Sequence, residues 1–171
     1  MRKRHRVRRI TATGTADYQD VFEVTISERR SPEQWARAVF QDAPPPVRWF
    51  LLLGWRALLG LRLRRPLSSA HHILGWQVAA SDGATIRLAL SSPLMNAQLL
   101  FRVSDDALTL TTDIAYLDRA GWLIWALVAP VHRRMIPYLL TRAAAGRCRP
   151  CPGRTVLVEK EGGAGQDGPV V

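Results

Sequence analysis

The chain has 171 residues, of which 47% are hydrophobic, and this is enough material for one domain with its own core. Its net charge of +10 is concentrated at the start, where six of the first nine residues are Lys or Arg. These six charges leave only +4 for residues 10–171, which is ordinary for a soluble domain and argues against nucleic acid as a partner.

The composition divides the chain into three segments. We expect the basic residues 1–16 to be a disordered tail, residues 17–146 to be a single domain, and the Pro- and Gly-rich residues 147–171 to be a second disordered tail. Residues 10–17 are small and polar where a secretory signal needs an apolar run. The apolar runs at 49–55 and 121–131 are shorter than the roughly 20 residues of a membrane span. We therefore expect a cytoplasmic protein.

The first predicted elements are a strand and a short helix. Residues 17–26 alternate apolar and polar side chains, which is typical of a half-buried strand, and only Asp20 interrupts the apolar face. Ser31 then supplies an N-cap, Pro32 suits the first helical position, and Gln34 completes a capping box. This signature predicts a helix that ends near residue 41.

A second helix and two hairpins follow. The prolines at 44–46 end the first helix and begin another, over residues 47–62, that is apolar on most sides. From residue 73 the apolar residues recur with a period of two. A Ser-Asp-Gly turn at 81–83 and an Asp-Asp turn at 105–106 each join two strands, so the pattern predicts two consecutive antiparallel hairpins.

The last predicted element is a long amphipathic helix over residues 121–145, with Asp118 as a plausible N-cap. Its apolar row contains two tryptophans and also His132, while arginines fall on the opposite side. Pro130 lies in its interior and should kink it, because proline removes one backbone hydrogen bond.

These elements predict an α+β fold of the helix-grip type. The expected order is β-α-α-β-β-β-β-α, with an antiparallel sheet of about five strands wrapped on the long C-terminal helix. We expect one face of the sheet to be covered and the other to be exposed to solvent, because polar side chains alternate with the apolar ones. Such an arrangement can enclose a cavity between the sheet and the helix.

Three segments resemble a known family. They are DYQDVFEV at 17–24, LLFRVS at 99–104 and GWLIWALVAPVHRRMIPYLL at 121–140, and the spacing of Trp125, Pro130 and His132 is the most specific part. They are similar to an uncharacterised bacterial family of START-like, polyketide-cyclase-like (SRPBCC) domains, some of which are fused behind an NAD-binding domain. The resemblance covers roughly residues 17–145. It implies a helix-grip fold with a hydrophobic pocket, but it supplies no catalytic residues because the family's activity is unassigned.

The apolar faces of the strands and the last helix should converge on one interior with few polar groups, which favours noncatalytic binding of a small hydrophobic or aromatic ligand. The residues expected to line this site are Trp76, Leu88, Phe101, Ile114, Tyr116, Trp125 and His132.

His132 allows three interpretations. It can be a core histidine that is hydrogen-bonded to a neighbour, or a polar anchor for a ligand, since a neutral imidazole both donates and accepts. It can also be the general acid or base of a cyclase- or dehydratase-type enzyme, with Tyr116 as a donor. The inward strand faces offer only Asp20 as a partner carboxylate, so the sequence leans away from an enzyme.

A competing hypothesis is peripheral association with an anionic membrane surface through the helix at 47–65 and the basic N-terminus. Trp49 and Trp55 beside Arg56 and Arg62 would place indole rings at the headgroup level with arginines reaching phosphates. The alternative is that this helix closes the mouth of the grip.

No metal or cofactor is expected. Cys148 and Cys151 form a single C-x-x-C pair in a Pro-rich tail, where a zinc ribbon needs a second pair and a thioredoxin site needs a helix, so they are interpreted as incidental thiols. The adjacent His71 and His72 point to opposite sides of an extended segment and cannot easily chelate one ion. No glycine fingerprint for a nucleotide follows a predicted strand.

Overall fold

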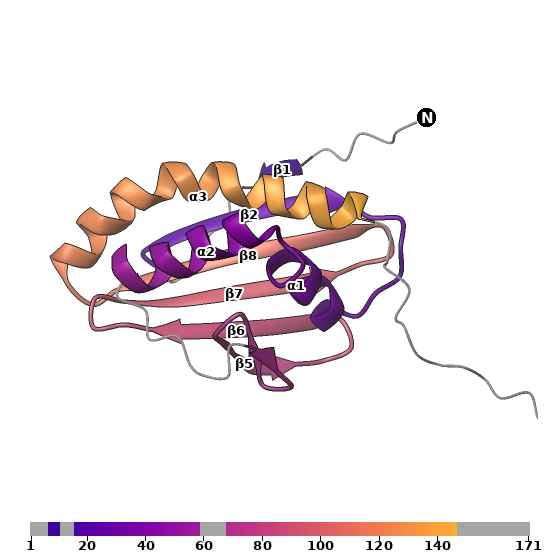
Figure 1. Cartoon of the computed structure of the whole chain (residues 1–171), viewed down its shortest axis with the longest axis horizontal. Helices are drawn as coiled ribbons and strands as arrows, with labels where there is room; N and C mark the ends of the chain where they lie inside the picture. Colours follow the sequence, from indigo (N-terminus) through magenta and orange to yellow (C-terminus); the bar gives the residue numbers. More distant parts are fainter. Residues whose placement is uncertain (1–6, 11–15, 59–67, 147–171) are drawn as a thin grey trace, which may run out of the picture.

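The computed structural model describes residues 7–10, 16–58 and 68–146 of the chain, with side chains from residue 16 onward except at residues 57, 58 and 68. An antiparallel sheet forms one layer, and the helices lie together across one of its faces (Figure 1). The fold is therefore α+β, with the predicted long C-terminal helix over the sheet. This confirms the fold class expected from the sequence.

Eight strands are present in the described part of the chain, in the spatial order β1-β2-β8-β7-β6-β5-β4-β3. All neighbouring pairs are antiparallel. The strands are β1 (Val7–Ile10), β2 (Tyr18–Thr25), β3 (Ser68–Ser69), β4 (His72–Ile73), β5 (Trp76–Ser81), β6 (Thr85–Ser91), β7 (Met95–Val103) and β8 (Ala107–Tyr116).

The sheet is larger than the expected five strands. The two short strands β3 and β4 extend one edge, and β1 pairs with β2 at the other, with Val7 opposite Val24 and Ile10 opposite Val21. Strand β1 lies inside the segment 1–16 that we expected to be disordered, so that expectation is wrong for these four residues. Pairing at the edge of a sheet uses main-chain groups only. The sequence VRRI has no alternation of apolar and polar side chains, so no pattern predicted this strand.

The two hairpins β5-β6 and β7-β8 form as predicted, with alternate residues of β6, β7 and β8 buried. The first turn is held by Asp82, whose carboxylate accepts hydrogen bonds from the Thr85 hydroxyl at 2.8 Å and from the Ala84 N–H at 2.8 Å. These hydrogen bonds lower the pKa of Asp82, and the bond from the Thr85 hydroxyl has the largest effect. The ionised carboxylate therefore stabilises the turn.

Helix α1 (Pro32–Phe40) has the predicted capping box, since the Ser31 hydroxyl accepts from the Gln34 N–H and the Gln34 side chain accepts from the Ser31 N–H. Helix α2 (Pro45–Leu53) begins in the proline run and continues as a π-helical turn, η1 (Gly54–Leu58). The remainder of the helix expected up to residue 62 lies outside the described residues.

Helix α3 (Arg119–Ala145) is capped by Asp118 and is continuous through Pro130 and Pro137. Figure 1 shows it curving over the sheet, and the backbone hydrogen bonds that the two prolines remove account for this path. Its first turn lies close to the β6–β7 loop, because a Cβ on Gly121 would come within 2.3 Å of the Leu94 carbonyl oxygen. Only glycine permits this approach, which fixes where α3 starts across the sheet.

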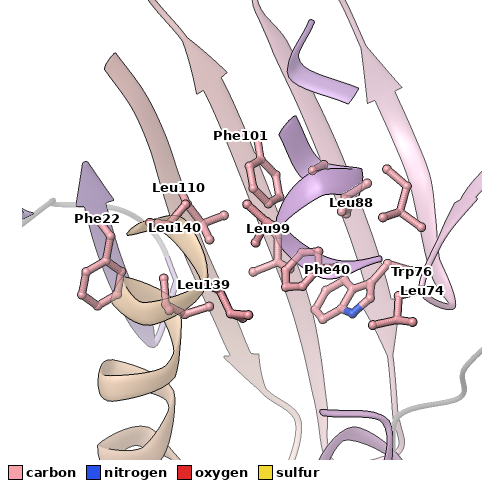
Figure 2. Packing of buried hydrophobic residues seen from close by; sticks show 14 of the residues in the cluster. Phe22, Phe40, Leu74, Trp76, Leu88, Leu99, Phe101, Leu110, Leu139 and Leu140 are labelled. Carbon is pink, nitrogen blue, oxygen red and sulfur yellow. The ribbon is translucent and has the colours of Figure 1, made fainter. Parts of the chain in front are cut away.

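The hydrophobic core fills the layer between the sheet and the helices. Figure 2 shows Phe22, Phe101 and Leu110 on the strands facing Phe40 on α1 and Leu139 and Leu140 on α3, and all of these side chains are buried. Phe101 packs edge-on against Phe40, with 5.8 Å between ring centroids. Helix α1 contacts both β6 and β7 and so covers this part of the sheet.

Candidate functional site

A cavity of about 230 Å³ lies between the sheet, α2 and the middle of α3. The sheet contributes inward-facing residues of three strands: Trp76, Ala97, Leu99, Thr112 and Ile114. The preceding helices contribute Phe40, Phe50, Leu51, Gly54 and Trp55. Helix α3 contributes residues of its inner face and flank between positions 124 and 136: Ile124, Trp125, Leu127, Val128, Val131, His132, Met135 and Ile136.

One wall of the cavity is a row of aromatic rings. Trp55 lies edge-on against both Phe40 and Trp76, with ring centroids 5.7 and 5.5 Å apart. Edge-to-face pairs at this distance hold the rings in one arrangement, because the positive edge of one ring meets the negative face of the next. The wall is therefore preformed, and Trp55 joins η1 to the sheet.

His132 forms part of the opposite wall. Its ring lies 5.2 Å from the ring of Trp125 and 6.5 Å from that of Phe22, measured between centroids. Burial first, and then the positive charge of Arg133, lower the pKa of His132 to about 4. The imidazole is therefore neutral at neutral pH, and one of its nitrogens can accept a hydrogen bond while the other donates.

Four residues that line the cavity each have a buried side-chain polar atom without a hydrogen-bond partner: Nε1 of Trp76, Nε1 of Trp125, Oγ1 of Thr112 and Nε2 of His132. These four atoms are half of the eight side-chain atoms in this condition within the described residues. A buried polar atom without a partner costs roughly 1–3 kcal/mol, so four around one space require an explanation.

A charged cluster lies beside this wall. Tyr18 donates its hydroxyl hydrogen to Asp20, whose side chain is completely buried, and Arg133 Nε lies 3.6 Å from the Asp20 carboxylate. Arg133 Nε also donates to the Tyr18 oxygen at 3.2 Å, and Tyr18 lies edge-on to Trp125 at 5.1 Å. The cluster satisfies the one carboxylate on the apolar face and holds Trp125 in place.

The structure brings together four of the seven residues predicted to line a ligand site: Trp76, Ile114, Trp125 and His132 lie on the cavity wall. Leu88 and Phe101 are fully buried in the filled core instead, because α1 lies over β6 and β7 there. Tyr116 is half-buried at the end of β8 and is not on the wall. Burial, followed by the Asp17 carboxylate, raises its pKa, so its phenol stays protonated.

Sequence reasoning did not identify Thr112 or Trp55 as cavity residues. Thr112 lies in register between the buried Leu110 and Ile114, and this alternation was the available signal for its inward direction. Trp55 was a membrane-contact candidate and lies on the cavity wall. Of the other candidates for membrane contact, Trp49 and Arg56 are exposed, and Arg62 lies outside the described residues.

The described segments show no helix that is long and apolar enough to cross a membrane. Nor, among residues 7–10, 16–58 and 68–146, do three His, Cys, Asp or Glu side chains meet in a group suited to a metal. His72 pairs with the Ser69 hydroxyl at 3.2 Å and His71 is exposed. Cys148 and Cys151 lie outside the described part of the chain, as does the tail at 147–171.

Comparison with known proteins gives one finding. A family model matches residues 12–139, and the family is described as "Protein of unknown function (DUF2867)". No curated protein and no solved structure matches the chain. The matched segment covers well over half of the chain and includes every residue of the cavity wall.

Proposed function

This chain belongs to the DUF2867 family, a family of unknown function, and we propose that it binds a small, mostly apolar or aromatic ligand in the cavity, without catalysing a reaction. The observation that carries the proposal is the set of four unpartnered polar atoms on residues that line an otherwise apolar cavity. Ligand sites of this kind combine apolar walls with a few polar groups that orient the ligand.

The polar atoms specify what the ligand must carry. An indole N–H only donates, so Trp76 and Trp125 each require an acceptor such as a carbonyl oxygen. The Thr112 hydroxyl and the neutral His132 ring can each donate or accept a hydrogen bond. A ligand with an apolar body and carbonyl-type oxygens meets these demands, and it is uncharged because the wall holds no charged side chain at neutral pH.

The finer assignment to the START-like, helix-grip domains is part of this proposal. A long C-terminal helix across an antiparallel sheet, with a hydrophobic cavity between them, supports it. The enzyme hypothesis receives less support, because Tyr116, the donor it needs beside His132, does not line the cavity.

Titration calorimetry of the full chain with tetralin and α-tetralone tests the proposal. The two bicyclic probes differ by one carbonyl oxygen. Both should bind, and α-tetralone should bind roughly fivefold more tightly, which corresponds to a net hydrogen bond of about 1 kcal/mol.

Filling the cavity should abolish both interactions. Ala97 is buried on the cavity wall, so Ala97→Leu places a larger side chain in the space. Ala115→Leu is the matched control, because Ala115 is exposed in the neighbouring strand. The proposal is wrong if neither probe binds the wild-type chain, or if Ala97→Leu binds both as the wild type does.

A further inference from the structure

An exposed apolar surface surrounds the mouth of the cavity. We call it the mouth face and define it by Trp49, Phe50 and Leu53 of α2 and by Leu123, Leu127 and Val131 of α3. Trp49 is 73% exposed and Leu127 is 78% exposed. Single exposed apolar residues are ordinary on a protein surface, but a continuous group of large ones marks a contact with something else.

The cavity places three of these six residues, from both helices, on one side of the molecule. Phe50, Leu127 and Val131 remain exposed and also line the same cavity, so they form its rim. Leu123, Leu127 and Val131 follow one another at intervals of four residues, so they form one stripe along α3. Figure 1 shows α2 running beneath this first half of α3.

The charged side chains within α2, η1 and α3, the elements that surround the mouth face, have one sign. Helices α2 and α3 and the turn η1 contain arginines and no Asp or Glu, and Arg56, Arg119 and Arg134 are exposed. Tryptophan and arginine together suit the interfacial zone of a bilayer, where the indole ring lies among the headgroups and the guanidinium binds phosphate. We infer that the mouth face docks on the surface of a bilayer that contains anionic lipids.

A second copy of the chain fits this surface less well. A two-fold dimer through the mouth face would bring the same elements of both copies together, and therefore arginines against arginines. Docking in the plane of the surface also agrees with the absence, in the described segments, of a membrane-spanning helix. The inference concerns the outside of the molecule and does not depend on what occupies the cavity.

Co-sedimentation of the full chain with vesicles tests the inference. We expect binding to vesicles of equal parts phosphatidylcholine and phosphatidylglycerol, weaker binding to phosphatidylcholine alone, and a decrease with added salt. The double variant Trp49→Ser/Leu127→Ser should bind the anionic vesicles at least about tenfold more weakly, because it removes two of the exposed apolar contacts. Leu100→Ser, on the outer face of β7, should bind as the wild type does.

The basic residues 1–9 are present in all these proteins, so binding through the N-terminus alone would leave the double variant at the wild-type level, and that result would overturn the inference. So would failure of the wild type to bind either vesicle, or a dimer in solution that buries the mouth face. If the double variant does not fold, the single variants Arg56→Gln and Arg87→Gln test the same inference. Both residues are exposed, but Arg87 lies on β6 away from the mouth face, so only Arg56→Gln should weaken binding.

Discussion

The layer between the sheet and the helices is filled at one end and open at the other. Beneath α1 and the second half of α3, large side chains such as Phe101, Leu139 and Leu140 are fully buried in the hydrophobic cluster. Beneath α2 and the first half of α3, residues of the same apolar kind surround a cavity of about 230 Å³. Apolar composition therefore does not distinguish a core from a binding cavity.

The two ends also differ in how their polar atoms are satisfied. At the open end, four residues of the wall each have a buried polar atom without a partner, and the rim is exposed and apolar. A core that evolved for stability alone would fill such a space or pair such atoms, since each defect costs of the order of 1 kcal/mol or more. The filled end therefore stabilises the fold, whereas the unfilled space and unpartnered atoms of the open end lower the stability.

The largest effect on stability is expected when a buried leucine at each end is replaced by alanine. Leu139 is fully buried at the filled end, so Leu139→Ala should lower the free energy of unfolding by about 4 kcal/mol, because it leaves a new cavity among packed neighbours. Leu99 is buried but borders the existing cavity, so Leu99→Ala should cost about 2 kcal/mol, since fewer packing contacts are lost. Urea unfolding measures both, and equal losses would contradict the division into two ends.

Enlarging one buried alanine at each end tests the same comparison, because it adds volume where the leucine substitutions remove it. Ala36 is fully buried on α1, so Ala36→Leu overpacks the filled end and should lower the free energy of unfolding by up to about 3 kcal/mol. Ala97→Leu projects into the cavity and should change it by less than about 1 kcal/mol. If Ala97→Leu proves as costly as Ala36→Leu in the same urea experiment, the cavity is not open to a larger side chain.

The sequence predicted the elements well because their signals are local. The capping box at Ser31, the N-cap at Asp118 and the period-two burial of β7 and β8 each depend on residues close together in the chain. The same alternation identified which strand side chains face inward, including Trp76 and Ile114, which line the same cavity as His132. Local rules were therefore sufficient for strands β2, β5, β6, β7 and β8 and for their covered face.

The division of that face into a core and a cavity could not be predicted. Phe101 and Ile114 have equivalent positions in the alternation, yet α1 covers the first and the cavity borders the second. The difference depends on where α1 and α2 lie across the strands, which is set by contacts between distant segments. Strand β1 was missed for a related reason, because its pairing with β2 uses the backbone.

The pH dependence of stability tests whether His132 is buried and neutral. Its pKa is about 4 in the folded chain and near 6.5 in the unfolded chain, so between these values the unfolded chain binds the extra proton. Stability should therefore fall as the pH falls through this window, by about 2 kcal/mol between pH 7 and pH 5. His132→Gln has no such proton, and urea unfolding at both pH values should show a smaller decrease for it. Equal decreases in the two proteins would mean that His132 titrates normally.

The smallest expected effect concerns the hydroxyl of Thr112. In the ligand-free chain this buried oxygen has no partner, and Thr112→Val replaces it with a methyl group of nearly the same size. We expect the free energy of unfolding to rise by about 1 kcal/mol, because an unsatisfied polar group is removed without leaving a void. Thr111→Val, on the opposite face of β8 where the side chain is half-buried, is the matched control and should show no such gain.

The same substitution separates stability from binding. If the Thr112 hydroxyl contacts the ligand, Thr112→Val should lose part of the preference for α-tetralone over tetralin while Thr111→Val keeps it. A rise in stability together with this loss indicates that the open end retains a polar group at a cost to folding. A fall in the stability of Thr112→Val would instead show that the hydroxyl is satisfied in solution, and the case for a ligand would then depend on the two indole donors and His132 alone.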